Sequence, residues 1–173
     1  MAAETSDFSW IEGWETAESS GRDRREAERL LAYWERKAQE FGEENITIAS
    51  IDIGNMNTRE WSNRFLISVD PVVERSALLL YGPRFAKTLS LPEQPRMDLP
   101  MMRQLPNRYA SVFLQGCGEA LRQMQAVRLE GEVERYDDRL EQYRVVFVPV
   151  GVKPNSLTCF AFGAFSNRVI DRP

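Results

Sequence analysis

Histidine is absent from this chain of 173 residues, and its absence excludes several kinds of chemistry. Catalytic Ser-His-Asp and Cys-His arrangements both need an imidazole, as do histidine-ligated haem and histidine-containing zinc sites. A phosphoaccepting histidine is excluded as well. The sequence therefore favours sensing or binding over catalysis, and we expect neither an enzyme nor a metal site.

Cysteines are few, and long apolar runs and net positive charge are missing. The two cysteines, Cys117 and Cys159, lack metal-ligand spacing and are typical of small buried side chains in a reducing compartment. No apolar run reaches the roughly 18 residues of a membrane span, and the first residues lack a signal-peptide pattern. The net charge is −4 and the pI about 5.1. We expect a cytoplasmic protein whose main partner is neither nucleic acid nor a membrane.

The composition is sufficient for one ordinary core, since 43% of the residues are hydrophobic and 10% are aromatic. We expect residues 1–20 to form a poorly ordered leader, residues 21–44 an amphipathic helix and residues 45–170 a single domain. Trp10 and Trp14 stand out in the leader. They belong either to a simple tail or to a segment that docks on the domain or on a partner.

The helix expected over residues 21–44 has an apolar stripe with a period of 3.6 residues. Charged residues occupy the remaining positions, and Gly42 is a suitable stop. The stripe packs either on its own domain or against a second chain, so we expect a homodimer as well as an unidentified signalling partner. The interface residues predicted on this helix are Leu30, Leu31, Trp34 and Phe41.

The middle of the chain contains a predicted hairpin. Residues 45–62 fit either a strand or a connector that tucks isoleucines into the core. Residues 64–70 and 76–81 are apolar runs around a five-residue linker, which predicts two paired strands. Prolines then limit the chain to short helical turns, at Pro92, Pro95 and Pro100.

A second amphipathic helix is predicted from about Pro106 to Ala126. It contains Gly116 and Gly118, and a glycine inside a helix costs roughly 1 kcal/mol relative to alanine. Two glycines therefore indicate either close approach of another group to the helix backbone or room for a bound molecule.

Three strands are predicted to close the chain. Residues 127–135 alternate between apolar and charged side chains. We expect Arg135 to pair with Glu141, because this register places Glu132 opposite Arg144 and avoids opposed like charges.

In the final hairpin we expect Val152 opposite Leu157, which would place Phe160 and Phe162 on the same face as Phe147. Both faces of these strands are then apolar, so both need to be covered. One face would meet the long helix and contain the ligand-binding candidates, although core packing alone also explains them: Phe113, Cys117, Leu129, Phe147, Phe160 and Phe162. The other would be covered by the first helix and contain the interface candidates Val146, Val148 and Ala161.

The order of these elements resembles that of the PAS domain, over roughly residues 22–168. Two local motifs are similar to those of small stand-alone bacterial PAS proteins, namely Leu78-Leu79-Leu80-Tyr81-Gly82 and the apolar strand from Tyr143 to Val150. The resemblance implies an α+β fold with a five-stranded antiparallel sheet and flanking helices. It also implies a cavity between sheet and helices, and dimerisation through an N-terminal helix.

The sequence departs from the PAS sensors that carry a chromophore. The flavin motif Asn-Cys-Arg-Phe-Leu-Gln is missing, and Phe113-Leu114-Gln115 precedes Cys117 without the rest. Haem has no histidine to bind. We therefore expect no cofactor, and we expect output through another protein because no effector segment follows.

Three functions remain open. The first is a PAS-like sensory or adaptor module acting through protein contacts, with or without a small apolar ligand. The second is a ligand-free interaction or dimerisation module. The third is a proton-transfer enzyme on a cone-shaped α+β scaffold of the ketosteroid-isomerase kind, using a carboxylate with Tyr143 or Tyr109. We favour the first, and the third least, because no Asp or Glu is expected on the inner face of the closing strands to act as the carboxylate of such an enzyme.

Overall fold

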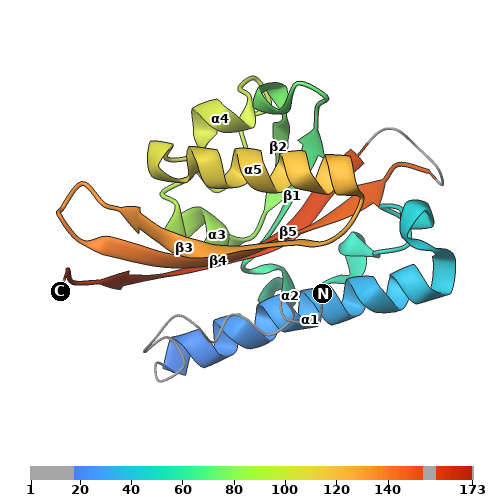
Figure 1. Cartoon of the computed structure of the whole chain (residues 1–173), viewed down its shortest axis with the longest axis horizontal. Helices are drawn as coiled ribbons and strands as arrows, with labels where there is room; N and C mark the ends of the chain where they lie inside the picture. The colour runs from blue at the N-terminus through green and yellow to red at the C-terminus, as the bar shows by residue number, and fades with distance from the viewer. Residues whose placement is uncertain (1–17, 154–158, 173) are drawn as a thin grey trace.

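The α+β architecture expected from the sequence is confirmed by the computed structural model (Figure 1). The structure describes residues 18–153 and 159–172. Trp10, Trp14 and most of the expected leader lie outside the described residues, so their docking stays a prediction.

Five antiparallel strands form one sheet, in the order β2-β1-β5-β4-β3. Three of its four pairings join strands that are consecutive in the chain, and the fourth brings β5 back beside β1. This is the five-stranded antiparallel sheet that the resemblance implies. The strands are β1 (Arg64–Val69), β2 (Ala77–Tyr81), β3 (Val127–Glu134), β4 (Leu140–Gly151) and β5 (Cys159–Ile170).

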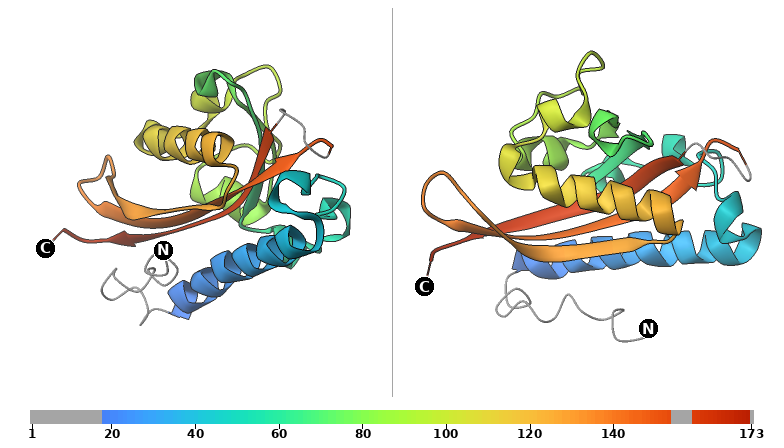
Figure 2. Two further views of the ribbon diagram at one scale, coloured as in Figure 1. Left: turned by 45° about the vertical axis from the view of Figure 1, so that its right-hand side comes forward. Right: turned by 45° about the horizontal axis from the view of Figure 1, so that its top comes forward.

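Helices cover both faces of this sheet (Figures 1 and 2). The helix α1 (Glu18–Phe41) lies on the face that we call outer, and α5 (Asn107–Gln123) lies on the opposite, inner face. Gly42 follows α1 with a positive φ of 86°, a conformation that costs glycine little because it has no Cβ atom. The shorter helical segments are η3 (Glu43–Asn45), η4 (Ile53–Asn55), α2 (Thr58–Trp61), η5 (Val73–Arg75), α3 (Pro83–Thr88) and α4 (Met101–Gln104).

The hairpin predicted around residues 71–75 is confirmed as β1 and β2. The ambiguous residues 45–62 form a connector of short helical turns, and an isolated bridge joins Thr47 to Gly151 of β4. Ile46 and Ile51 are buried against the outer face, as the connector alternative requires.

The predicted register between β3 and β4 is wrong by two residues. Glu130 lies opposite Arg144, whereas Glu132 lies opposite Gln142. A shift of two residues preserves the side-chain alternation, so the faces of both strands are as expected. The opposition of a glutamate to Arg144 is also preserved, with Glu130 in place of Glu132.

The predicted register between β4 and β5 is wrong by one residue, and this error reverses the faces of β5. Val148 pairs with Phe162, and Gly151 pairs with Cys159. Phe160 and Phe162 consequently belong to the outer face, and Ala161 to the inner face beside Phe147. Because side chains alternate with a period of two, a slip of one residue moves every side chain of the strand.

Candidate functional site

The inner core is filled by aromatic rings that contact one another. The ring of Phe113 on α5 lies 5.3 to 6.1 Å, centre to centre, from those of Phe65, Phe85, Phe147 and Phe165. Such separations are typical of favourable tilted and edge-to-face ring contacts. The space between α5 and the sheet is therefore occupied by side chains of the chain itself.

The close packing of α5 on the sheet depends on the absence of a side chain at Gly116. A Cβ atom at Gly116 would lie 2.0 Å from Cε1 of Phe147, a distance that no real contact allows. Likewise, a Cβ at Gly163 would lie 2.2 Å from Cζ of Phe65. The sequence left two explanations for the glycines in α5. At Gly116 the structure confirms the first, because the ring of Phe147 approaches the helix backbone closely.

The predicted ligand-binding residues are divided between the two faces. Phe113, Cys117 and Phe147 are buried in the inner core, and Leu129 packs half-buried beside them. The remaining two, Phe160 and Phe162, are on the outer face, where Phe162 stacks on Trp61 at 6.0 Å. The expectation that Phe160 and Phe162 share a face with Phe147 is therefore wrong, because the register of β5 differs by one residue. A ligand-binding role for the six residues stays a prediction.

A flavin does not fit these residues. The resemblance implies a cavity between helices and sheet, and the ring of Phe113 with the four rings around it occupies that space. Burial raises the pKa of the Cys117 thiol well above its ordinary value, which disfavours the thiolate. Among the described residues, no group of three or more His, Cys, Asp and Glu side chains could hold a metal ion.

The interface candidates lie mostly between α1 and the outer face of the same chain. Leu30, Leu31 and Trp34 are buried against Val146 and Val148. The indole Nε1 of Trp34 donates a hydrogen bond of 3.1 Å to the carbonyl of Pro149. The apolar stripe of α1 thus packs on its own domain, which is the first of the two alternatives given by the sequence.

Two interface candidates lie elsewhere. The Phe41 side chain is 42% exposed, and the Lys37 ammonium lies 5.7 Å from the centre of its ring. Ala161 faces the inner core, for the register reason given above. A role of any of these seven residues between two chains stays a prediction.

A buried carboxylate is the polar centre of the inner face. The Glu141 side chain is fully buried and accepts hydrogen bonds from four side chains. Arg108 binds both carboxylate oxygens, at 3.1 and 3.2 Å, and Arg135 donates at 2.7 Å. Asn167 donates at 3.1 Å, and the Tyr109 hydroxyl also donates. The first turn of α5 is thereby tied to β4, to β5 and to the residue after β3.

The expectation that no acidic residue lies on the inner strand face was wrong. Glu141 alternates with Tyr143, Val145 and Phe147, and applying the two-residue period one step further back would have identified it. Its partners Arg108 and Asn167 come from distant parts of the chain, and no local sequence pattern could have indicated them.

The electrostatics of Glu141 are those of a structural ion pair. Burial by itself raises its pKa, but hydrogen bonds from Arg108 and Tyr109 outweigh burial, and the pKa is lowered from the ordinary 4.5. Burial and the hydrogen bond to Glu141 both raise the pKa of Tyr109. A general base works best with a pKa near the working pH, so an ionised, doubly paired carboxylate and a protonated tyrosine do not favour proton transfer.

Solved LOV-domain structures, which represent a subfamily of PAS domains, resemble this chain. A variant of the protein RsLOV matches with a TM-score of 0.42 and 19% identity, over 61% of each chain. The LOV protein of Rhodobacter sphaeroides gives 0.39 and 16%, over 61% of this chain and 60% of that one. A fungal LOV-domain photoreceptor gives 0.41 and 19%, over 68% and 79%.

Likenesses of this size support no conclusion about ligand, partner or activity, and what the structure itself establishes is a five-stranded antiparallel sheet with helices on both faces. No protein-family model and no curated protein matches the chain. Among the described residues, no helix combines the length and the apolar character that crossing a bilayer requires.

Proposed function

We propose that this protein is a cytoplasmic PAS-like sensory or adaptor module that catalyses no reaction and acts through protein contacts, with α1 as its output element. One observation carries the proposal: α1 covers the apolar outer face of the sheet with Leu30, Leu31 and Trp34. A helix docked on a sheet exposes a large apolar surface when it leaves, and such a surface is suited to binding a partner.

The packing of the inner core supports a module that works without a ligand in the core. Phe147 closes onto Gly116, and Phe65 closes onto Gly163. A small apolar ligand between α5 and the sheet would need these rings to move, at the cost of several ring contacts. We therefore assign the working surface to the outer face.

A homodimer remains part of this proposal. Exchange of α1 between two copies would keep every contact that Leu30 and Trp34 make with the sheet, because the partner presents the same surface. The connector of residues 42–63 would then be the hinge of the exchange. A signalling partner that replaces α1 would use the same face.

The proposal is tested by hydrogen exchange on the Leu30→Glu variant. A buried glutamate at this position opposes docking of α1, because burying an unpaired charge is costly. We expect the amides of α1 to lose protection while β1, β4 and β5 keep theirs. Loss of protection throughout the sheet would make α1 an integral part of the fold and would contradict the proposal.

Ala32→Glu is the matched control, since Ala32 lies on the exposed side of the same helix. It introduces the same side chain two residues away without burying the charge. We expect exchange in α1 to match the unmodified protein.

A further inference from the structure

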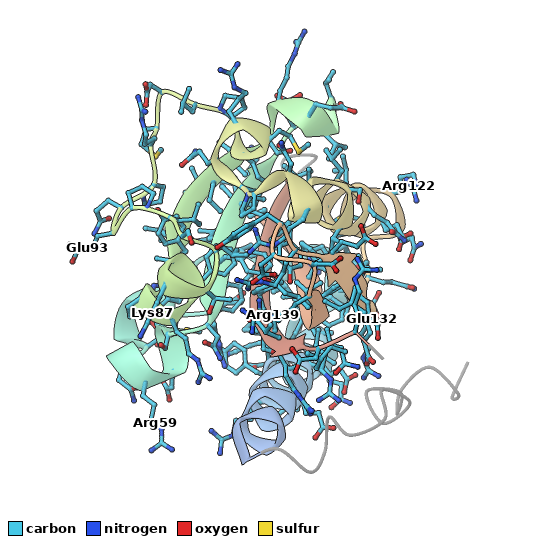
Figure 3. The ribbon with its side chains drawn as sticks, turned by 90° about the vertical axis from the view of Figure 1, so that its left-hand side faces the viewer. Arg59, Lys87, Glu93, Arg122, Glu132 and Arg139 are labelled. Carbon is cyan, nitrogen blue, oxygen red and sulfur yellow. The ribbon has the colours of Figure 1, made fainter. Side chains whose placement is uncertain are left out.

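A positively charged cleft opens beside the Glu141 network, between α3, the end of β5 and the turn after β3. Its volume is about 570 Å³, within the roughly 300 to 1,000 Å³ of small-molecule sites. Seven residues line it: Pro83, Arg84, Lys87, Thr88, Arg135, Asn167 and Val169. Figure 3 views this side of the molecule, with Lys87 and Arg139 labelled.

The local sequence explains why cations gather here. Arg84, Lys87 and Thr88 are three and four residues apart on α3, so they share one side of that helix, while Phe85 and Ala86 are buried on the other. On β5, Asn167 and Val169 alternate onto the inner face. Three separate elements thus direct polar or charged side chains to one place.

The charge of the cleft contrasts with that of the chain. Its described lining contains three cations and no carboxylate, in a protein with a net charge of −4. Lys87 is exposed, and it has no hydrogen bond or ion pair with any described residue. Because Arg135 is already paired with Glu141 and Asp137, Lys87 supplies most of the positive charge that a bound anion would meet here.

Arg135 is held in position for such an anion. Its Nη1 donates to Glu141 at 2.7 Å, and its Nε donates to Asp137 at 3.2 Å. The Nη2 group makes no hydrogen bond to any described residue. A guanidinium fixed on two sides keeps its third edge oriented, which reduces the entropy lost on binding.

We infer that this cleft is a binding site for a small molecule carrying a phosphate or carboxylate group, with Lys87, Arg84 and Arg135 as the anion-binding residues and Asn167 as a polar neighbour. Phosphate and carboxylate are the anions that arginine and lysine bind best in proteins. The site is separate from the aromatic core and does not depend on α1 acting as an output element. Through Arg135 and Asn167, an anion bound here lies one side chain from Glu141 and hence from α5.

The test is an NMR titration of the amide signals with inorganic phosphate and, separately, with citrate, each compared with sodium chloride at equal ionic strength. We expect the amides of α3 and of residues 167–169 to shift with at least one of the two anions. Shifts with phosphate alone would indicate a ligand that carries a phosphate group, and shifts with citrate alone would indicate a carboxylate ligand. Shifts with both would indicate a site that binds either anion. Shifts that sodium chloride reproduces would overturn the inference.

Substitutions of Lys87 test whether the anion binds in this cleft. Lys87→Gln should weaken it about tenfold, as expected for losing one charge-assisted contact. Lys87→Arg should restore it, which a merely altered fold would not do. Lys153→Gln is the matched control, because Lys153 is also exposed and follows the opposite end of β4. If Lys87→Gln and Lys153→Gln bind the anion with equal affinity, the proposed site is wrong.

Discussion

The ring of Phe147 lies where a side chain on Gly116 would begin, with Cε1 only 2.0 Å from an ideal Cβ position. This relationship joins β4 to the middle of α5 and fixes the distance between helix and sheet. The rings of Phe65, Phe85 and Phe165 also contact Phe113 on the same helix.

Gly116→Ala should destabilise the protein by about 2 kcal/mol. Overpacking a well-filled core costs typically 1 to 3 kcal/mol, which exceeds the gain of roughly 1 kcal/mol in helix propensity. The measurement is the free energy of unfolding in urea. A stabilised Gly116→Ala variant would contradict the packing described for Phe147.

Gly118→Ala should have the opposite effect, although the residue lies only two positions along the same helix. A Cβ there meets its nearest neighbours, Arg122 and Val73, at 3.7 and 3.8 Å, which is ordinary contact. The helix propensity gain should therefore appear as about 1 kcal/mol of added stability. Equal effects at Gly116 and Gly118 would show that propensity alone decides both positions.

Glu141→Gln should destabilise the protein by about 3 kcal/mol, because it leaves Arg108 without its anion and Arg135 with Asp137 alone. The matched control is Glu134→Gln. Glu134 pairs with Arg172 but its side chain is 74% exposed, so a change within about 0.5 kcal/mol is expected. Comparable losses in both variants would contradict a special role for burial.

The contribution of Glu141 to the free energy of unfolding should decrease at acid pH. Its pKa is lowered on folding from the ordinary 4.5, so its carboxylate stabilises the folded state above that pH. The contribution is lost as the pH falls through the lowered, folded pKa. The difference in unfolding free energy between the unmodified protein and Glu141→Gln should stay constant above pH 4.5 and shrink below it. A difference that persists at lower pH would contradict the lowered pKa.

Native mass spectrometry should give the mass of two chains, and Leu30→Glu should shift the population toward one chain. The expected cause is weaker docking of α1 on the partner's sheet. A compact monomer that is unaffected by the substitution would contradict the dimer.

The purified protein should show no flavin or haem absorption band. The chain has no histidine, and the rings around Phe113 occupy the space between helices and sheet. An ultraviolet–visible spectrum is the measurement, and a band of either cofactor would contradict the expectation that the protein binds neither.

Prediction of the elements from the sequence succeeded where local periodicity is strong. The stripe of Leu30 and Trp34 predicted α1, and the apolar face of residues 106–126 predicted α5. Prediction of the faces of β5 failed because it assumed Val152 opposite Leu157, whereas the observed pairing of Gly151 with Cys159 differs from that register by one residue. Phe162 and Ala161 exchanged faces for that reason alone.

The sequence by itself determined the order of the elements and the absence of histidine chemistry, because each depends on residue identity or on short-range spacing. The tertiary structure decided which strand faces meet which helix, and it decided the partners of Glu141. Arg108, Arg135 and Asn167 converge on that carboxylate from separate elements, and only the complete sheet brings those elements together. The cationic cleft beside Arg135 arises from the same long-range pairing, which no local pattern specifies.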